Sequence, residues 1–192
     1  MTMAQPIRKK EDLQELKNYY QTIHPNMRNY LLIHLGVNTA LRISDLLSLT
    51  WNDVYDFKKK SFRSHITLIE RKTKKQNKLP LSPSVKQALM EYKNNLHKVD
   101  PYHYLFYGKF PHAPLSRCQA YRILKNASLA LQLETPISCH SLRKTFGYYA
   151  WQAGVPSVML MNIYNHSNFQ ITKRYLGIEQ DEKDNVFLNL DL

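Results

Sequence analysis

The sequence predicts a mainly helical α+β domain that contains one small antiparallel β-sheet. Most segments repeat apolar residues at helical spacing, whereas the stretch from residue 54 to residue 81 is rich in β-forming residues and lysine-containing turns. The chain has 192 residues, 43% of them hydrophobic, which is enough to bury one sizeable core. We therefore expect residues 1–192 to form a single domain.

The first part of the chain predicts three helices. Residues 9–22 carry an apolar stripe at helical spacing, and Asn26 is a suitable N-cap for a second helix over residues 27–38. A third, short helix is expected over residues 42–50, with three of its leucines facing the core. Residues 27–54 can also be interpreted as a helix–turn–helix, which would suit a DNA-binding protein without enzymatic activity.

The next part of the chain predicts the sheet. The segments VYDF, SHITLIE and NKLPLS indicate two or three antiparallel strands, with RKTKKQ at the tip of a hairpin. Lys72 lies in this tip together with further basic residues. A lysine at such a tip can reach into a DNA groove or towards a phosphate ester, although most lysines in a turn are simply solvated.

The second half of the chain returns to helical patterns. Residues 99–115 contain three prolines and one glycine and are expected to be a loop. Pro83 suits a first helical turn, and Gly154 suits a helix C-terminus. The tail from Asp184 to Leu192 includes the apolar residues Val186, Phe187, Leu188 and Leu190 and is expected to dock against another surface. Helices are predicted over residues 83–98, 116–132, 139–153, 156–163 and 168–176.

Charge is unevenly distributed along the chain. Lysine and arginine exceed aspartate and glutamate by 27 − 15 = 12. Residues 58–78 hold nine basic residues and one acid, Glu70, whereas residues 179–192 hold five acids and one lysine. A surplus this large favours a polyanionic partner such as double-stranded DNA, and a solvated basic surface without a ligand is the alternative.

Other features narrow the class of protein. Cys118 and Cys139 match neither a metal-binding spacing nor a disulfide framework, which favours a reducing cytoplasm as the location. The sequence has no apolar run of the length that spans a membrane, and its first residues do not resemble a secretory signal. Neither a glycine-rich phosphate loop nor a cluster of carboxylates for two metal ions is present. The chemistry available to the chain is therefore expected to need no metal or cofactor.

Two pairs of polar residues are candidates for phosphate binding. His140 and Arg143 are three residues apart and share one face of a helix, where both could bind the same phosphate. Arg42 lies in an apolar neighbourhood, and Asp45, three residues later, could hold its guanidinium group. Taken alone, the first pair could be a chance surface arrangement and the second a simple salt bridge.

The segment YNHSNFQITKRYLG contains a further pair of candidates. His166 lies in its loop-like start, and Tyr175 lies nine residues later near the end of a short predicted helix. A tyrosine in such a place is usually structural.

The order of these residues resembles that of the tyrosine recombinase (phage integrase) family. Its catalytic domain is marked by a TGLRxSE-like box, a hairpin lysine often in a KTxK context, an HxLRxT box, a GHS-like box and a tyrosine shortly after. The corresponding segments here are NTALRISDLL, RKTKKQNKLPL, HSLRKTF, NHSN and KRYLG. The resemblance covers about residues 8 to 178 and implies the catalytic-domain fold of that family.

The resemblance also implies site-specific DNA recombination or integration through a 3′-phosphotyrosine intermediate. Its implied catalytic residues are Tyr175 as nucleophile, His140 as base, Lys72 as acid for the 5′-oxygen, and Arg42, Arg143 and His166 as ligands of the scissile phosphate, with Asp45 in support. A type IB topoisomerase-like nicking-closing enzyme would use much the same residues and stays an alternative.

The sequence departs from the family pattern at three positions. Ala40 and Asn165 stand where glycine is usual, and Lys144 stands where a second histidine is common. The catalytic core is expected over about residues 8–178, followed by the tail 179–192. The helical domain that usually precedes it in the family is expected to be absent.

Two kinds of partner contact are expected. The tail resembles C-terminal segments that pack onto a neighbouring subunit in related recombinases, and docking on its own core is the alternative. DNA phosphates are expected to be contacted by ten basic residues: Lys58, Lys59, Lys60, Arg71, Lys74, Lys75, Lys78, Arg117, Arg122 and Lys125.

Overall fold

The computed structural model describes residues 4–190 and confirms the mainly helical α+β class. No helix in this part of the chain has the length and apolar character needed to cross a bilayer. The helices are α1 (Lys10–Asn18), a π-helical turn η1 (Tyr19–Ile23), α2 (Met27–Thr39), α3 (Ile43–Leu46), α4 (Trp51–Val54), α5 (Pro83–Asn94), α6 (Arg117–Ala130), α7 (Cys139–Gln152), α8 (Ser157–Tyr164), α9 (Phe169–Leu176) and α10 (Glu179–Asn189). The strands are β1 (Tyr55–Asp56), β2 (Ser61–Phe62), β3 (His65–Ile69) and β4 (Gln76–Pro80).

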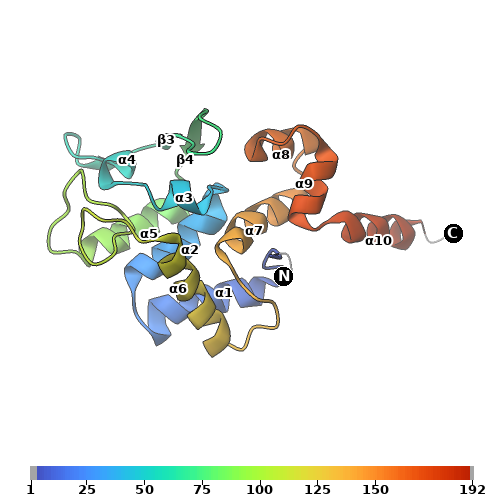
Figure 1. Ribbon diagram of the computed structural model, residues 1–192, viewed down its shortest axis with the longest axis horizontal. Helices are drawn as coiled ribbons and strands as arrows, with labels where there is room; N and C mark the ends of the chain where they lie inside the picture. Colours follow the sequence, from blue (N-terminus) through green and yellow to red (C-terminus); the bar gives the residue numbers. More distant parts are fainter. Residues whose placement is uncertain (1–3, 191–192) are drawn as a thin grey trace.

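Helix α2 forms the centre of the main core. It begins at the predicted place, because the side chain of Asn26 accepts a hydrogen bond from the backbone amide of Asn29. Leu31, Leu32 and Ile33 are fully buried, so the helix is apolar on more than one side. Helices α1, α5 and α7 pack around it (Figure 1).

This burial contradicts the helix–turn–helix interpretation of residues 27–54. Helix α2 is enclosed by its neighbours, and α3 is a single turn, too short to read a DNA groove.

The predicted third helix over residues 42–50 is wrong beyond Leu46, where α3 ends. The chain leaves helical geometry because Thr50 is extended and forms a capping box with Asp53 that starts α4. The leucines of this segment are buried as expected.

The β-region consists of two separate two-stranded ladders rather than one sheet. Strands β1 and β2 pair with each other, and β3 pairs with β4 in antiparallel register. Ile66 of β3 lies opposite Leu79 and is fully buried, which anchors the second ladder on the core. Residues 70–75 form the turn between β3 and β4, so the predicted hairpin is confirmed.

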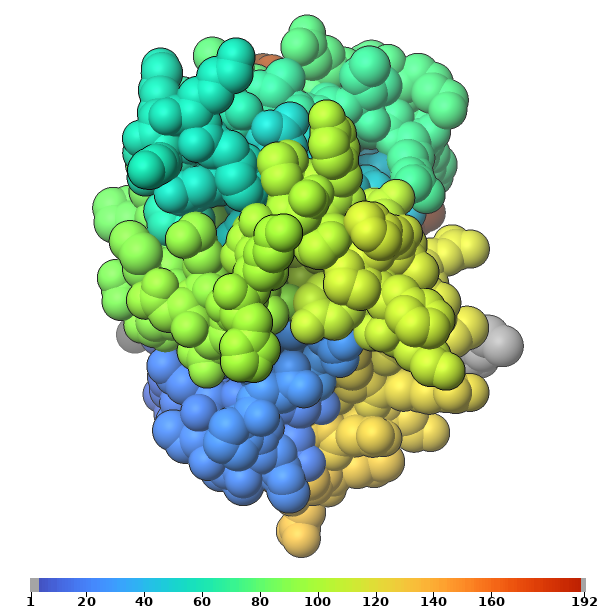
Figure 2. All heavy atoms as spheres, turned by 90° about the vertical axis from the view of Figure 1, so that its left-hand side faces the viewer, coloured from blue at the N-terminus to red at the C-terminus, as the bar shows by residue number. Residues whose placement is uncertain are grey.

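The loop of residues 99–115 covers one face of the molecule. In Figure 2 it is the yellow-green band across the middle of the face, above the blue N-terminal helices. Leu105 and Phe106 are fully buried, and Leu105 donates its amide proton to the carbonyl of Leu49. The loop is therefore fastened to the core although it lacks regular secondary structure.

A second, smaller core supports the C-terminal helices. It contains Tyr148 from α7, Tyr164 from α8 and Leu176 from α9. Helix α7 approaches α9 closely because residue 147 is glycine, where an added Cβ atom would lie 2.5 Å from the side chain of Leu176. Gly154 has a φ of +77° just beyond α7, as expected for the residue that ends this helix.

Helix α10 extends away from the body of the molecule (Figure 1). Its first turns are tied down by an ion pair of 2.6 Å between Arg8 and Asp181 and by another between Lys173 and Glu182. Its apolar side chains are not packed on the rest of the described chain, since Phe187 is 79% exposed and Leu188 76% exposed. Docking of the apolar tail residues on their own core is therefore wrong for residues 186–190, although the first turns of α10 are held to the body.

Candidate active site

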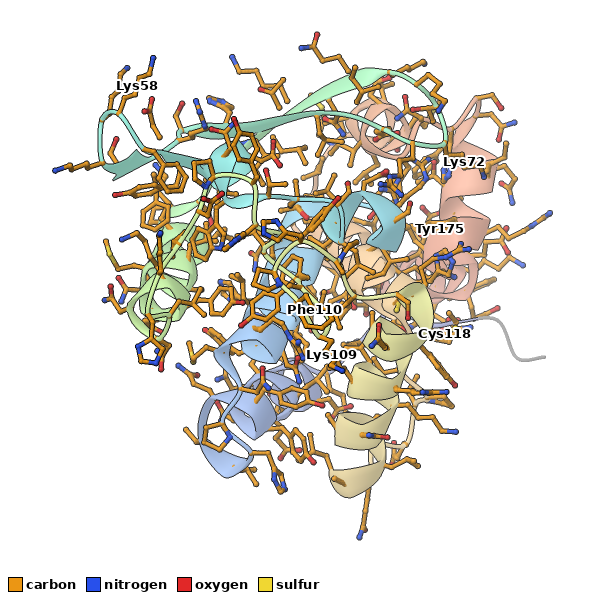
Figure 3. The ribbon with its side chains drawn as sticks, turned by 60° about the vertical axis from the view of Figure 1, so that its left-hand side comes forward. Lys58, Lys72, Lys109, Phe110, Cys118 and Tyr175 are labelled. Carbon is orange, nitrogen blue, oxygen red and sulfur yellow. The ribbon has the colours of Figure 1, made fainter. Side chains whose placement is uncertain are left out.

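The six candidate catalytic side chains lie around one cavity of about 1160 Å³. Distant parts of the chain meet there, and Figure 3 shows Lys72 and Tyr175 on the same side of the molecule. The contributing residues are Arg42 at the N-cap of α3, Lys72 in the hairpin turn, His140 and Arg143 in the first turns of α7, His166 between α8 and α9, and Tyr175 near the end of α9.

Arg143 is fixed in the wall of this cavity. Its side chain is 4% exposed, and its guanidinium group lies 4.6 Å above the centre of the Tyr164 ring. One of its amino groups donates a hydrogen bond to the carbonyl of Ala40. The hydroxyl of Tyr164 in turn donates to the backbone carbonyl of Arg143 at 2.7 Å. A buried arginine held in this way presents its remaining donors in one orientation.

Arg42 is paired with Glu70, not with Asp45 as expected. Its Nη1 lies 2.6 Å from Oε2 of Glu70, which is 1% exposed. The side chain of Asp45 instead accepts a hydrogen bond of 3.0 Å from the backbone amide of Arg71. Asp45 therefore supports the start of the hairpin turn, next to Lys72. Spacing along a helix could not reveal this, because α3 is too short and the partner lies 28 residues away.

His166 and Tyr175 both line the cavity, and their rings lie next to each other. Their ring centres are 5.4 Å apart, with the ring planes at 72°. Nδ1 of His166 lies 3.0 Å from the hydroxyl oxygen of the buried Thr172, which fixes the orientation of the imidazole. Within residues 4–190 the other ring nitrogen of His166 makes no hydrogen bond, which leaves it for a ligand.

Both histidines of the site have a pKa below the usual value for histidine. Burial lowers the pKa of His140, and the charges of Lys144 and Arg143 lower it further. Burial also lowers the pKa of His166, followed by the charges of Arg143 and Arg42. Each imidazole is therefore neutral at neutral pH and can accept a proton.

The phenol of Tyr175 keeps its proton in the free protein. Burial raises its pKa, and this effect outweighs the opposing charges of Arg143 and Arg42. The ammonium group of Lys144 lies 5.0 Å from the centre of the same ring. Lys144 is 3% exposed, and its Nζ has no hydrogen-bond partner in residues 4–190. The sequence did not indicate this buried cation behind the tyrosine.

The two positions that lack the family's usual glycine have left-handed backbone. The φ angle is 52° at Ala40 and 56° at Asn165. These are angles that glycine adopts easily and that asparagine tolerates better than alanine. The backbone turn is thus kept at both places without glycine.

The basic residues expected to bind DNA fall into three groups. Arg71, Arg117, Arg122 and Lys125 line the cavity, the last three from α6. Lys74, Lys75 and Lys78 lie on the β3–β4 hairpin beside it, and Lys75 and Lys78 face a second cavity behind the hairpin. Lys58, Lys59 and Lys60 lie in the β1–β2 turn, and Figure 3 shows Lys58 far from Lys72 and Tyr175.

Glu70 is the main residue that the sequence did not single out. It appeared only as the one acid in a basic segment. Burial by itself would raise the pKa of Glu70, but hydrogen bonds from Thr73 and Arg42 outweigh this effect and lower it. An isolated acid among nine basic residues is a signal that could have identified the partner of Arg42.

Comparison with known proteins identifies the family. Residues 8–182 match the phage integrase family. The probable integrase/recombinase YoeC of Bacillus subtilis (strain 168) is 42% identical over 181 residues, which are 94% of this chain and 93% of that protein. A tyrosine recombinase of Pseudothermotoga lettingae is 27% identical over 170 residues, which are 88% of this chain but 56% of that protein. The chain thus spans only about half the length of that second relative.

Solved structures show the same fold. The crystal structure of XerA recombinase matches all of this chain and 66% of that chain, with a TM-score of 0.76 at 16% identity. The Tn1549 transposon integrase in complex with a circular intermediate DNA matches 91% of this chain and 62% of that chain, with a TM-score of 0.65 at 25% identity. The chain therefore belongs to the phage integrase family and has the catalytic fold of a tyrosine-type site-specific recombinase.

Proposed function

We propose that the protein cuts and rejoins DNA strands through a covalent 3′-phosphotyrosine intermediate formed by Tyr175. The observation that carries this proposal is the meeting of a tyrosine, two arginines, two histidines and a lysine around one cavity. These are the groups needed for attack on a phosphodiester by a side chain: a nucleophile, a base, cations for the phosphate oxygens and an acid for the leaving oxygen.

The roles follow from the chemistry of each group. The oxygen of Tyr175 forms a bond to phosphorus, and the bond from phosphorus to the 5′-oxygen breaks. His140 takes the phenolic proton. It can do so because its lowered pKa keeps its imidazole neutral at neutral pH. Lys72 gives a proton to the departing 5′-oxygen. A 5′-hydroxyl then gives its proton back to Lys72 and attacks the phosphorus, the bond from phosphorus to the Tyr175 oxygen breaks, and His140 returns the proton to the phenol. One phosphodiester thus replaces another, and the energy of the bond is conserved.

The remaining groups stabilise the transition state. Arg42, Arg143 and His166 contact the non-bridging oxygens, where negative charge develops. Loss of one donor of this kind typically raises the barrier by about 3 kcal/mol. Double-stranded DNA would lie across the cavity, with its phosphates on the basic residues of α6 and the hairpin.

A suicide DNA substrate tests the proposal, because a nick next to the cleavage site lets the cut fragment diffuse away and traps the adduct. We expect the protein to form an adduct that maps to Tyr175, in EDTA as well as in buffer. Tyr175→Phe should give no detectable adduct while DNA affinity changes by less than about twofold. Tyr121→Phe is the matched control, because Tyr121 lines the same cavity and the proposed mechanism assigns it no step.

Two outcomes would contradict the proposal. One is an adduct that persists in Tyr175→Phe or maps to another residue, and the other is a strict requirement for a divalent metal in cleavage. Relaxation of supercoiled plasmid without joining of strands between duplexes would instead indicate a nicking-closing enzyme.

We also propose that α10 packs onto a neighbouring subunit on DNA. Its apolar side chains are exposed and are not buried against any other part of residues 4–190. The double variant Phe187→Ser/Leu188→Ser keeps the ion pairs of α10 and should bind DNA only as single copies, whereas the unchanged protein forms complexes of two or more copies. Native gel electrophoresis separates the two cases, and unchanged assembly of the variant would refute this role.

A further inference from the structure

Glu70 is a buried carboxylate at the end of β3 that joins several parts of the site. Its Oε2 accepts hydrogen bonds from Nη1 of Arg42 at 2.6 Å and from the hydroxyl of Thr73 at 2.7 Å. Its Oε1 accepts one from the side chain of Asn77 at 3.0 Å. A longer contact of 3.4 Å links Oε2 to Nδ2 of Asn165. One carboxylate thus contacts the α2–α3 junction, the hairpin turn, strand β4 and the end of α8.

Such burial is unfavourable unless the charge is fully compensated. An ionised carboxylate removed from water loses its hydration, and only short, well-directed hydrogen bonds and an opposite charge offset this loss. The donors around Glu70 meet that requirement, and its lowered pKa keeps it ionised at neutral pH. The geometry of Arg42 is therefore tied to that of Glu70, since moving either group would leave a buried charge unpaired.

The same arrangement leaves Arg42 available for a phosphate. Glu70 accepts a hydrogen bond from Nη1 of Arg42, and Arg42 also lines the cavity. Arginine carries five N–H donors in a planar fork, so one bond to a carboxylate fixes the plane and leaves other donors for phosphate oxygens.

Asn165 extends this arrangement to the segment that carries the nucleophile. It ends α8 in a left-handed conformation and directly precedes His166. Its side-chain oxygen accepts a hydrogen bond of 3.5 Å from Nζ of Lys75 in the hairpin turn, in addition to its own contact with Glu70. A glycine here could adopt the same backbone but could make neither contact.

We propose that Glu70 is a positioning residue that orients Arg42 on the scissile phosphate, and that Asn165 fastens the Lys72 hairpin to the His166–Tyr175 segment. The proposal rests on the proposed function of the site. Glu70 does not touch the DNA and acts through Arg42. Asn165 acts through the position of Lys72, three residues before Lys75.

The variant Glu70→Gln tests the first part. Glutamine keeps the size and one acceptor but removes the charge. We expect adduct formation on the suicide substrate to slow by about 10- to 100-fold, as for loss of an ordered charged hydrogen bond, with DNA affinity nearly unchanged. Glu134→Gln is the matched control, because it removes the carboxylate of an exposed ion pair with Lys9 outside the cavity and should react at the normal rate.

A double-mutant cycle separates positioning from general stability. If Glu70 acts through Arg42, Glu70→Gln should slow the reaction by less than about threefold in an Arg42→Ala background, because the group it orients is gone. Equal slowing in both backgrounds would overturn the proposal. So would Glu70→Gln reacting at the normal rate.

The variant Asn165→Gly tests the second part: it removes the contact with Lys75 and the long contact with Glu70 but leaves the 2.6 Å bond between Glu70 and Arg42 in place. It keeps the left-handed backbone, so the protein should fold even if Glu70→Gln does not. We expect adduct formation to slow severalfold on normal DNA and to recover on DNA whose 5′-bridging oxygen is sulfur, because a thiolate leaves without a proton from Lys72. Slowing that sulfur does not relieve, or no slowing at all, would overturn this role.

These outcomes are distinct from failure of the proposed function. If the unchanged protein forms no adduct at Tyr175, the proposed function fails. If it forms that adduct and neither variant slows the reaction, the proposed function stands and only this inference is lost.

Discussion

At the scale of single residues, Ala40 bears a conformational cost next to the active site. Its φ of 52° and ψ of 17° lie in the left-handed region, where the Cβ of an alanine is crowded. The carbonyl of Ala40 also accepts a hydrogen bond from the buried guanidinium group of Arg143. The strained turn between α2 and α3 thus places both Arg42 and the partner of Arg143.

We expect Ala40→Gly to stabilise the protein, because glycine adopts this conformation without crowding. The free energy of unfolding should rise by about 0.5 to 1 kcal/mol, measured by urea denaturation with an unchanged slope. The control is Ala150→Gly within α7, where glycine should lower stability by about 1 kcal/mol. Loss of stability in Ala40→Gly would show that the turn does not strain alanine.

At the scale of elements, α2 combines its central position with a buried histidine. His34 is 7% exposed, stacks on Tyr30 with ring centres 5.6 Å apart, and has no hydrogen-bond partner for either ring nitrogen among residues 4–190. Burial, followed by the charge of Lys17, lowers its pKa to about 4, and the opposing effects of the Ser84 backbone and of Glu91 are smaller. The imidazole of His34, in the middle of α2, therefore stays neutral until the pH is well below its usual pKa.

This burial predicts a stability that falls in mild acid. Between pH 6.5 and 4 the unfolded chain binds a proton at His34 and the folded protein does not, so the free energy of unfolding decreases as the pH falls through this window. The contribution is fully retained above about pH 6.5 and amounts to at most about 3 kcal/mol. His34→Phe should flatten the dependence in urea titrations, whereas replacing the exposed His97 with glutamine should not.

The β3–β4 hairpin is held in place by a buried carboxylate at its turn. Its strands are short and its turn is exposed, yet the buried carboxylate of Glu70 anchors the turn to Arg42 and to α8. Lys72 can therefore lie on an exposed turn and still keep a defined position relative to the cavity.

At the scale of the whole molecule, part of the basic surplus gathers around the cavity. Four of the basic residues expected to bind DNA line the cavity, and three more lie on the hairpin beside it. The acidic helix α10 extends away from the body of the molecule at the C-terminal end of the chain. This separation agrees with the proposed DNA path across the cavity and with the proposed packing of α10 on a neighbouring subunit.

We expect DNA affinity to fall steeply with salt, since contacts to phosphates release counterions. Arg122→Ala should reduce the slope of log affinity against log salt by about one, the value for one lost phosphate contact. Lys58→Ala, in the distant β1–β2 turn, is the comparison: an unchanged slope confines the DNA to the cavity side, and an equal reduction extends the DNA to that turn. Affinity that does not change with salt would refute the electrostatic footprint.

The sequence alone determined the class of fold, most helix boundaries and the set of candidate catalytic residues that line one cavity. Helix starts such as Asn26 and Pro83 and helix ends such as Gly154 depend on local chemistry, which neighbouring residues specify. The order of the reactive residues along the chain was likewise sufficient to suggest the family.

Only the tertiary structure decided which groups hold one another. Arg42 pairs with Glu70 rather than Asp45, Lys144 lies buried behind Tyr175, and the side chains of α10 stay exposed. Each of these depends on contacts between segments far apart in sequence, and on the cost of leaving a buried charge unpaired, neither of which periodicity or spacing can express.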